Sequence, residues 1–162
     1  MKSTRPPELA NVPWITAEGK LDCSKFPIDV PIRQCLDPNS EAFGHGCRFL
    51  GSLVSAGRVD AAIFLLGLLR YYEEDLTAAT IVVESLAAFH DPRCATALFG
   101  ELRRVPSSNT TRRYLDTVIT SLTRLPAGMV QDRFSELSRD TAFSYRMRVK
   151  FRDAAEAIAH HW

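Results

Sequence analysis

A pattern of apolar residues recurs after 33 positions in the middle of the chain. Phe64–Leu69 reads Phe-Leu-Leu-Gly-Leu-Leu, and Ala97–Leu102 reads Ala-Leu-Phe-Gly-Glu-Leu. The same offset brings three further apolar pairs into register, namely Val82 with Leu115, Leu86 with Ile119 and Phe89 with Leu122. A fixed period of this length is typical of arrays in which each unit buries its apolar face against its neighbours. The pattern therefore predicts a fold built from repeated units.

Within each unit the apolar residues follow the period of an α-helix. One example is the set Phe43, Cys47, Leu50 and Val54, which share a helix face because they are three or four positions apart. From residue 39 to the carboxyl end this spacing predicts about seven helices. No stretch shows the two-residue alternation that is typical of a half-buried strand. We therefore predict an all-α fold.

Several helix starts are marked by side chains that accept hydrogen bonds from the free amides of a first turn. Asn39 or Ser40 is the predicted cap of the first strong helix, and Asp75 or Thr77 that of a later one. The Asp91–Pro92 pair is the clearest signal, because proline loses nothing at the first helical position.

The segment Val59–Tyr71 is apolar on nearly every side. Gly57 precedes it and is predicted to end the helix before it, because glycine adopts left-handed backbone angles without a steric cost. A helix with no polar face is buried on several sides. We predict that Val59–Tyr71 is a central helix of the fold.

Residues 1–38 differ in composition from the rest of the chain. Proline removes a backbone donor and disfavours helix at the preceding residue, so this segment is predicted to be irregular. Its prolines make up six of the nine in the chain: Pro6, Pro7, Pro13, Pro27, Pro31 and Pro38. It also carries apolar residues that suit it to cover the first helices, and the end of a repeat array needs such a cover. We therefore expect a Pro-rich N-terminal cap at 1–38 and a helical repeat domain at 39–162.

The units resemble HEAT-like repeats. The resemblance is carried by an apolar first helix, Ile63–Leu69, an acidic turn, Glu73–Asp75, and an Ala-rich second helix, Leu76–Ala88. It implies a right-handed stack of about three antiparallel helix pairs, an α-solenoid, with an extra helix before the first pair. Such stacks bind other macromolecules through an extended surface, so the resemblance also implies a binding function.

Three units are expected, at roughly 58–90, 91–125 and 127–160. The third is the loosest match, and the turn of the second, Pro106–Asn109, lacks the acidic residue of the first.

Charge and hydropathy argue against three classes: membrane-spanning proteins, secreted proteins and dedicated nucleic-acid binders. The longest apolar run, Ala61–Leu69, is much shorter than the ~20 residues of a membrane span. No apolar stretch follows the first residues as in a secretory signal, so we expect a cytoplasmic protein without a membrane partner. The four cysteines are then expected to be reduced thiols. Residues 91–162 carry 12 Lys or Arg against 8 Asp or Glu, a milder excess than dedicated nucleic-acid binders have.

Two groups of side chains are candidates for a zinc site and for a catalytic site. Cys23, Cys35, His45 and Cys47 supply zinc-binding atoms but lack closely spaced Cys pairs, and Cys47 lies on an apolar stripe, so we favour core packing. His90, Asp91 and Cys94 are close in sequence, but Asp91 is better used as a helix cap, and nothing supplies an oxyanion hole. A helix amino terminus lowers a thiol pKa, which would allow Cys94 to be reactive without being catalytic, but we favour a structural role. We expect no catalytic residue, cofactor or metal, and no enzyme activity.

Basic residues of the second half form the candidate binding site. Some flank one turn and others lie close together near the carboxyl end, in the set Arg103, Arg104, Arg112, Arg113, Arg146, Arg148, Lys150 and Arg152. One interpretation is a solvated polar face, and the other is a surface for an anionic partner.

These observations lead to a functional hypothesis. We expect a non-catalytic adaptor that binds a protein partner, and the alternative is binding to the phosphate backbone of a nucleic acid. The resemblance also admits an enzyme of the bilin-lyase kind, for which the sequence holds no specific motif.

Overall fold

The computed structural model describes residue 9 and residues 11–160, and the described part of the chain is all-helical. Its eight helices are α1 (Asp29–Gln34), α2 (Phe43–Ser55), α3 (Val59–Tyr71), α4 (Leu76–Leu86), α5 (Pro92–Arg104), α6 (Arg112–Thr123), α7 (Ala127–Arg139) and α8 (Tyr145–His160). The only β pairing in this part is an isolated bridge between Ile15 and Leu21. The prediction of an all-α fold is confirmed.

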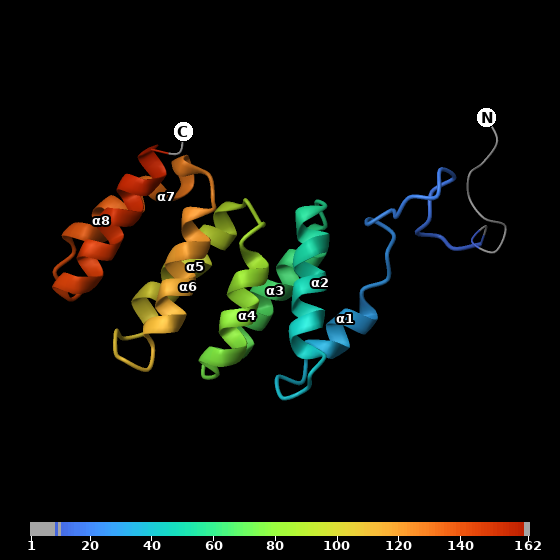
Figure 1. The fold of residues 1–162 in the computed structure, drawn as a ribbon, viewed down its shortest axis with the longest axis horizontal. Coiled ribbons are helices and arrows are strands. Elements are labelled where there is room, and N and C mark those ends of the chain that lie inside the picture. Colours follow the sequence, from blue (N-terminus) through green and yellow to red (C-terminus); the bar gives the residue numbers. More distant parts are fainter. Residues whose placement is uncertain (1–8, 10, 161–162) are drawn as a thin grey trace.

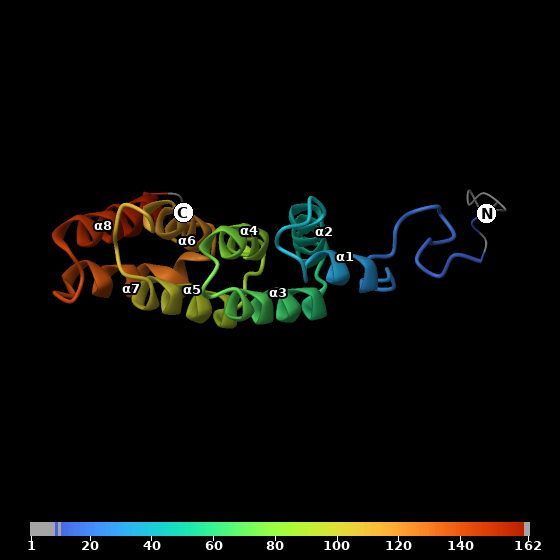
Figure 2. The same cartoon turned by 90° about the horizontal axis from the view of Figure 1, so that it is seen from below.

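The helices follow one another along the long axis of the molecule in chain order (Figure 1). Figure 2 shows two layers, one formed by α3, α5 and α7 and the other by α2, α4, α6 and α8. Every substantial helix–helix contact joins elements one or two places apart, such as α4 with α6 and α7 with α8. The even-numbered helices therefore form a continuous row.

An apolar core fills the space between the two layers. Its largest fully buried side chains include Phe43, Leu50, Leu65, Leu86, Leu98, Leu115, Phe134 and Phe151. Phe134 of α7 links neighbouring helices, because its ring lies 5.1 Å from that of Phe99 and 6.2 Å from that of Phe151. In the even row, Gly51 of α2 permits close approach, since a Cβ there would lie 2.9 Å from the backbone oxygen of Ser85 in α4.

Local signals explain several helix ends. The Asp75 carboxylate accepts from the amides of Thr77 and Ala78, and Asp91 accepts from that of Arg93, so both predicted aspartate caps are confirmed. Gly57 has a φ of 88°, as the end of α2 requires. The cap predicted for α2 is wrong. The preceding residue is Ala42, whose side chain cannot cap, and Ser40 instead accepts from the Ala42 amide within the turn.

The predicted burial of α3 on several sides is wrong. Val59 and Ile63 are 51% and 43% exposed, because α3 contacts α2 and α4 while no other helix among residues 11–160 covers its outer face. The apolar composition of α3 therefore led to a prediction of more burial than this helix has.

The segment before α2 is less irregular than its prolines suggest. Pro31 lies in the first turn of α1, where its missing N–H is not needed for a helical hydrogen bond. The Arg58 guanidinium ties the segment to the start of α3 by donating to the backbone oxygens of Cys23 and Phe26, at 2.8 Å each. The Phe26 ring lies 5.2 Å from that of Phe49 in α2. Residues 1–8 and 10 of the predicted cap lie outside the described residues.

None of the helices in the described part of the chain combines the length and the apolar composition needed to cross a membrane.

Candidate functional site

The row of even-numbered helices carries three consecutive surface grooves. They lie between α2 and α4, between α4 and α6, and between α6 and α8, with volumes of about 600, 470 and 340 Å³. Neighbouring grooves share lining residues, namely Glu84 and Arg124 for the first two and Asn109 and Arg112 for the last two. The three grooves therefore form one extended surface.

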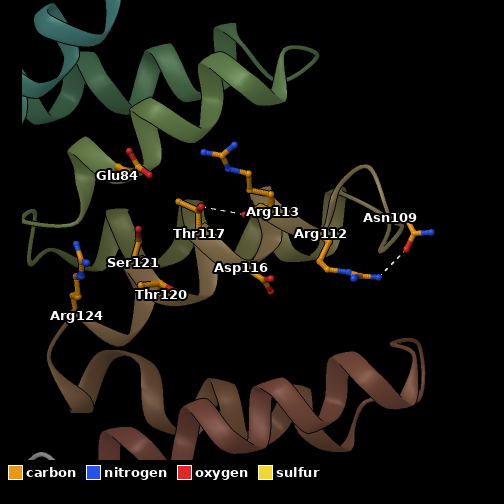
Figure 3. Close-up of a pocket in the computed structure, with 9 residues that line it drawn as sticks. All are labelled: Glu84, Asn109, Arg112, Arg113, Asp116, Thr117, Thr120, Ser121 and Arg124. Atoms are coloured by element: carbon orange, nitrogen blue, oxygen red, sulfur yellow. Dashed lines mark hydrogen bonds between the residues drawn. The ribbon is translucent and has the colours of Figure 1, made fainter.

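The central groove is bordered by cations at both ends of α6 (Figure 3). Arg112 and Arg113 lie in its first turn and Arg124 follows its last residue. The Arg113 side chain is directed toward α4, whereas Arg112 turns away from that helix and donates to Asn109 Oδ1 at 2.7 Å. Consecutive residues are about 100° apart around a helix, so these two side chains leave α6 in different directions.

The α6–α8 groove is the smallest and most enclosed of the three. Arg112 borders it from α6, and Arg146 and Lys150 border it from α8, one turn apart. Its floor is apolar, formed by the buried side chains of Leu115 and Met147. Lys150 is held by an ion pair with the Asp116 carboxylate of α6. Arg146 is exposed, and its side chain makes no hydrogen bond or ion pair within the described part of the chain.

The α2–α4 groove brings together residues far apart in sequence. Arg48 borders it from α2, Glu84 from α4, and Arg124 reaches it from the end of α6. His90, which follows α4, also lines this groove, so the groove contains an imidazole as well as the Glu84 carboxylate.

Cations outnumber carboxylates in the lining of the three grooves. Six cationic side chains, Arg48, Arg112, Arg113, Arg124, Arg146 and Lys150, stand against two carboxylates, Glu84 and Asp116. Serine, threonine and asparagine side chains supply much of the remaining lining. We call this surface the basic face.

Only some of the predicted basic residues lie on the basic face. Arg112, Arg113, Arg146 and Lys150 come together on the basic face. Arg152 lies instead in a groove between α7 and α8, with its guanidinium 4.0 Å from Asp153.

Arg148 is half-buried and does not line the basic face. Its guanidinium carbon lies 6.0 Å from the centre of the Tyr145 ring, and its Nε atom is buried without a hydrogen-bond partner in the described structure.

Arg103 and Arg104 do not line the three grooves of the basic face and already have anionic partners. They line a fourth groove at the end of α5, which borders the α6–α8 groove through Ser107, Leu115 and Met147. Arg103 pairs with Asp140 at 3.2 Å. Arg104 donates two hydrogen bonds to Glu101, at 3.1 and 2.5 Å. This pairing raises the pKa of Arg104 and fixes its guanidinium inside the protein's own network.

The Glu101 network locks α5 to α6. The Tyr114 hydroxyl donates to Glu101 Oε2 at 2.5 Å, and both residues are buried, at 2% and 8% exposure. Burial, followed by the bond to Glu101, raises the pKa of Tyr114 well above its ordinary value. The network therefore has a structural role, and it anchors the turn of α6 that carries Arg112 and Arg113.

Two residues of the basic face were missed by the sequence argument. Arg48 and Arg124 are isolated cations outside the basic clusters, so no local pattern marked them. They reach one groove only because α2, α4 and α6 lie side by side. The repeat itself was the available signal, because it predicts that successive second helices are neighbours.

The cysteine candidates are part of the core. Cys35 and Cys47 are fully buried with their sulfur atoms 3.5 Å apart, and His45 is exposed. Within the described residues no three His, Cys, Asp or Glu side chains are grouped to hold a metal ion. Cys94 is fully buried, and burial raises the pKa of its thiol to about 12, which agrees with the favoured structural role and not with a reactive thiol. Desolvation outweighs the effect of the helix amino terminus.

Comparisons of the chain with protein-family models, curated proteins and solved structures found no match.

Proposed function

We propose that this chain is a non-catalytic binding module, built as a short right-handed HEAT-like stack, that holds a protein partner with an acidic surface against the basic face. The observation that carries the proposal is the excess of six cations over two carboxylates on a surface that joins α2, α4, α6 and α8.

The arrangement of the helices supports the stack. The units expected at 58–90, 91–125 and 127–160 each contain two helices that contact one another, α3 with α4, α5 with α6 and α7 with α8. Gly67 of α3 and Gly100 of α5, which are 33 positions apart, both face open space, since a Cβ would meet nothing within 4 Å. Equivalent positions thus have equivalent surroundings in two units.

The chemistry of the face supports an anionic partner. Four of its five arginines, Arg48, Arg113, Arg124 and Arg146, have no hydrogen bond or ion pair from the guanidinium within the described part of the chain. A guanidinium offers a planar set of donors that matches a carboxylate in a forked geometry. These side chains are therefore available to a partner, unlike those of Arg103 and Arg104.

The two carboxylates favour a protein over a nucleic acid. Glu84 and Asp116 both line the central groove, where they would repel a phosphate backbone laid across the face. A protein surface carries both signs of charge and can place a cation opposite each carboxylate.

Affinity capture of the tagged chain from its native lysate tests the proposal. Capture is done after nuclease treatment, at low and at moderate salt, with the double variant Arg48→Gln/Arg124→Gln beside the unchanged chain. The matched control is Arg139→Gln/Arg152→Gln, which removes the same charge from the α7–α8 groove. We expect a stoichiometric protein partner that the first variant loses and the control retains. Equal retention by both variants would show that the basic face is not the binding surface.

The second candidate function is binding to a nucleic-acid backbone. It is favoured by the hydroxyl, amide and guanidinium groups of the lining, which are the side-chain groups that contact phosphates in such complexes. In the capture experiment, this function would be supported by recovery of nucleic acid, or of proteins that are lost after nuclease treatment. Its affinity would also fall steeply as salt increases.

A further inference from the structure

We propose that the α6–α8 groove binds the phosphate group of a phosphorylated serine or threonine. The proposed function supplies the source of this ligand, a protein partner, whereas the groove supplies its own evidence for the phosphate.

The groove gathers three cations from two helices around a small space. Arg112 of α6 faces Arg146 and Lys150 of α8 across about 340 Å³, and residues 107–109 close one end with two serines and an asparagine. A phosphoryl group offers three oxygens that accept strong hydrogen bonds, which matches donors arriving from several sides.

Two of the cations are already oriented before a ligand binds. Asn109 Oδ1 holds the Arg112 guanidinium at 2.7 Å through one of its five N–H donors, which leaves the others free. Asp116 holds the Lys150 ammonium. Less side-chain freedom is therefore lost on binding than with unrestrained side chains.

The charge of the groove fits a phosphate monoester. The three cations are offset only by Asp116, which lines the central groove and reaches this one through Lys150, so the balance is two positive charges. A phosphoserine or phosphothreonine carries about −1.5 to −2 at neutral pH, whereas a carboxylate or a nucleic-acid diester carries a single negative charge. A monoester therefore neutralises the groove and a diester does not.

The first experiment titrates the isotopically labelled chain with methyl phosphate, a monoester, and with dimethyl phosphate, a diester. Backbone amide spectra locate the binding. We expect saturable shifts at 107–112 and 146–150, with methyl phosphate about tenfold tighter because its second charge meets close cations in a partly enclosed groove. Arg146→Gln should weaken methyl phosphate about tenfold. Arg112→Gln is the second variant, and the amide spectrum itself reports whether each variant remains folded.

The matched control is Arg152→Gln, on the same helix and outside this groove. It should bind methyl phosphate as tightly as the unchanged chain does. Shifts that do not saturate, equal affinity for the diester, or an equal loss in the control would overturn the phosphate site.

A second experiment separates this inference from the proposed function. The lysate used for capture is treated with a protein phosphatase, and loss of the partner supports phosphorylation as the source of the ligand. A partner that is retained after phosphatase treatment, and by Arg146→Gln, leaves the proposed function standing and overturns this inference. Saturable methyl phosphate binding without any captured protein would instead uphold the phosphate site and count against the proposed function.

Discussion

Replacing Tyr114 with phenylalanine tests the contact between α5 and α6 that positions the first turn of α6. The substitution removes one oxygen and leaves the ring, which is buried at 2% exposure, in place. It deletes the 2.5 Å hydrogen bond to Glu101 and leaves the two bonds from Arg104 to the same carboxylate. The experiment therefore isolates a single buried hydrogen bond.

The expected loss follows from the type of bond. A hydrogen bond to a charged group contributes about 1.5 to 3 kcal/mol to stability. Because Glu101 keeps Arg104 as a partner and is not left buried without one, we expect the lower part of this range, about 1.5 to 2 kcal/mol. In a domain of this size each kcal/mol lowers the melting temperature by about 2 to 4 °C.

Denaturant unfolding followed by circular dichroism measures the loss at pH 7, with Tyr145→Phe as the matched control. Tyr145 is 73% exposed, and its hydroxyl makes no hydrogen bond within the described residues. The control should therefore change stability by less than ~0.5 kcal/mol. Similar losses in the two variants would refute the role of the buried hydroxyl.

The same pair of proteins has a defined pH dependence. The pKa of Tyr114 is raised in the folded chain, so its hydroxyl stabilises the fold fully below the ordinary tyrosine pKa of about 10. That stabilisation is lost as pH rises from there toward the folded-state pKa. The stability difference between the unchanged chain and Tyr114→Phe should accordingly shrink above pH ~10. Burial also raises the pKa of Tyr72, to about 12, but this contribution is common to both proteins and cancels in the difference.

Three further predictions concern other parts of the fold. Gly51→Ala should destabilise the fold by about 1 to 3 kcal/mol, because the added Cβ would meet the backbone of α4. Gly67→Ala should stabilise the fold by about 0.5 to 1 kcal/mol, because its Cβ would face open space. Denaturant unfolding measures both changes, and changes of the same sign would contradict the packing described for Gly51 and Gly67. Asp75→Ala should cost about 1 kcal/mol by removing the cap of α4, and an unchanged unfolding midpoint would show that solvent replaces the cap. A thiol reagent at pH 8 should modify the half-buried Cys23 first and leave the buried Cys94 unmodified in the folded chain. Peptide mass mapping identifies the modified cysteine, and early labelling of Cys94 would contradict its burial.

Of the three predicted caps, which act within one turn of helix, those of α4 and α5 were read correctly from the sequence and that of α2 was not. Asp75 and Asp91 cap the helices that follow them, because a capping side chain bonds to amides two or three residues away. The apolar period gave the fold class for the same reason, since it depends only on residues of one helix.

Features that depend on the neighbours of a helix were not predictable in this way. The sequence of α3 is apolar nearly all round, but Ile63 is exposed because no helix in the described part of the chain packs against that side of α3. Arg104 lies at a helix end where an arginine is commonly free, yet it donates to the Glu101 carboxylate, which also accepts from the Tyr114 hydroxyl of the neighbouring helix. The basic face likewise arises between helices, from residues as distant in sequence as Arg48 and Arg124.

The substantial helix–helix contacts among the described residues, which join helices one or two places apart, also have a kinetic consequence. Each contact closes a short stretch of chain, so the entropy lost in forming any one of them is small. Helical proteins with such a low contact order fold in microseconds to milliseconds. We therefore expect refolding to be rapid, with adjacent helix pairs able to form without waiting for the two ends of the chain to meet.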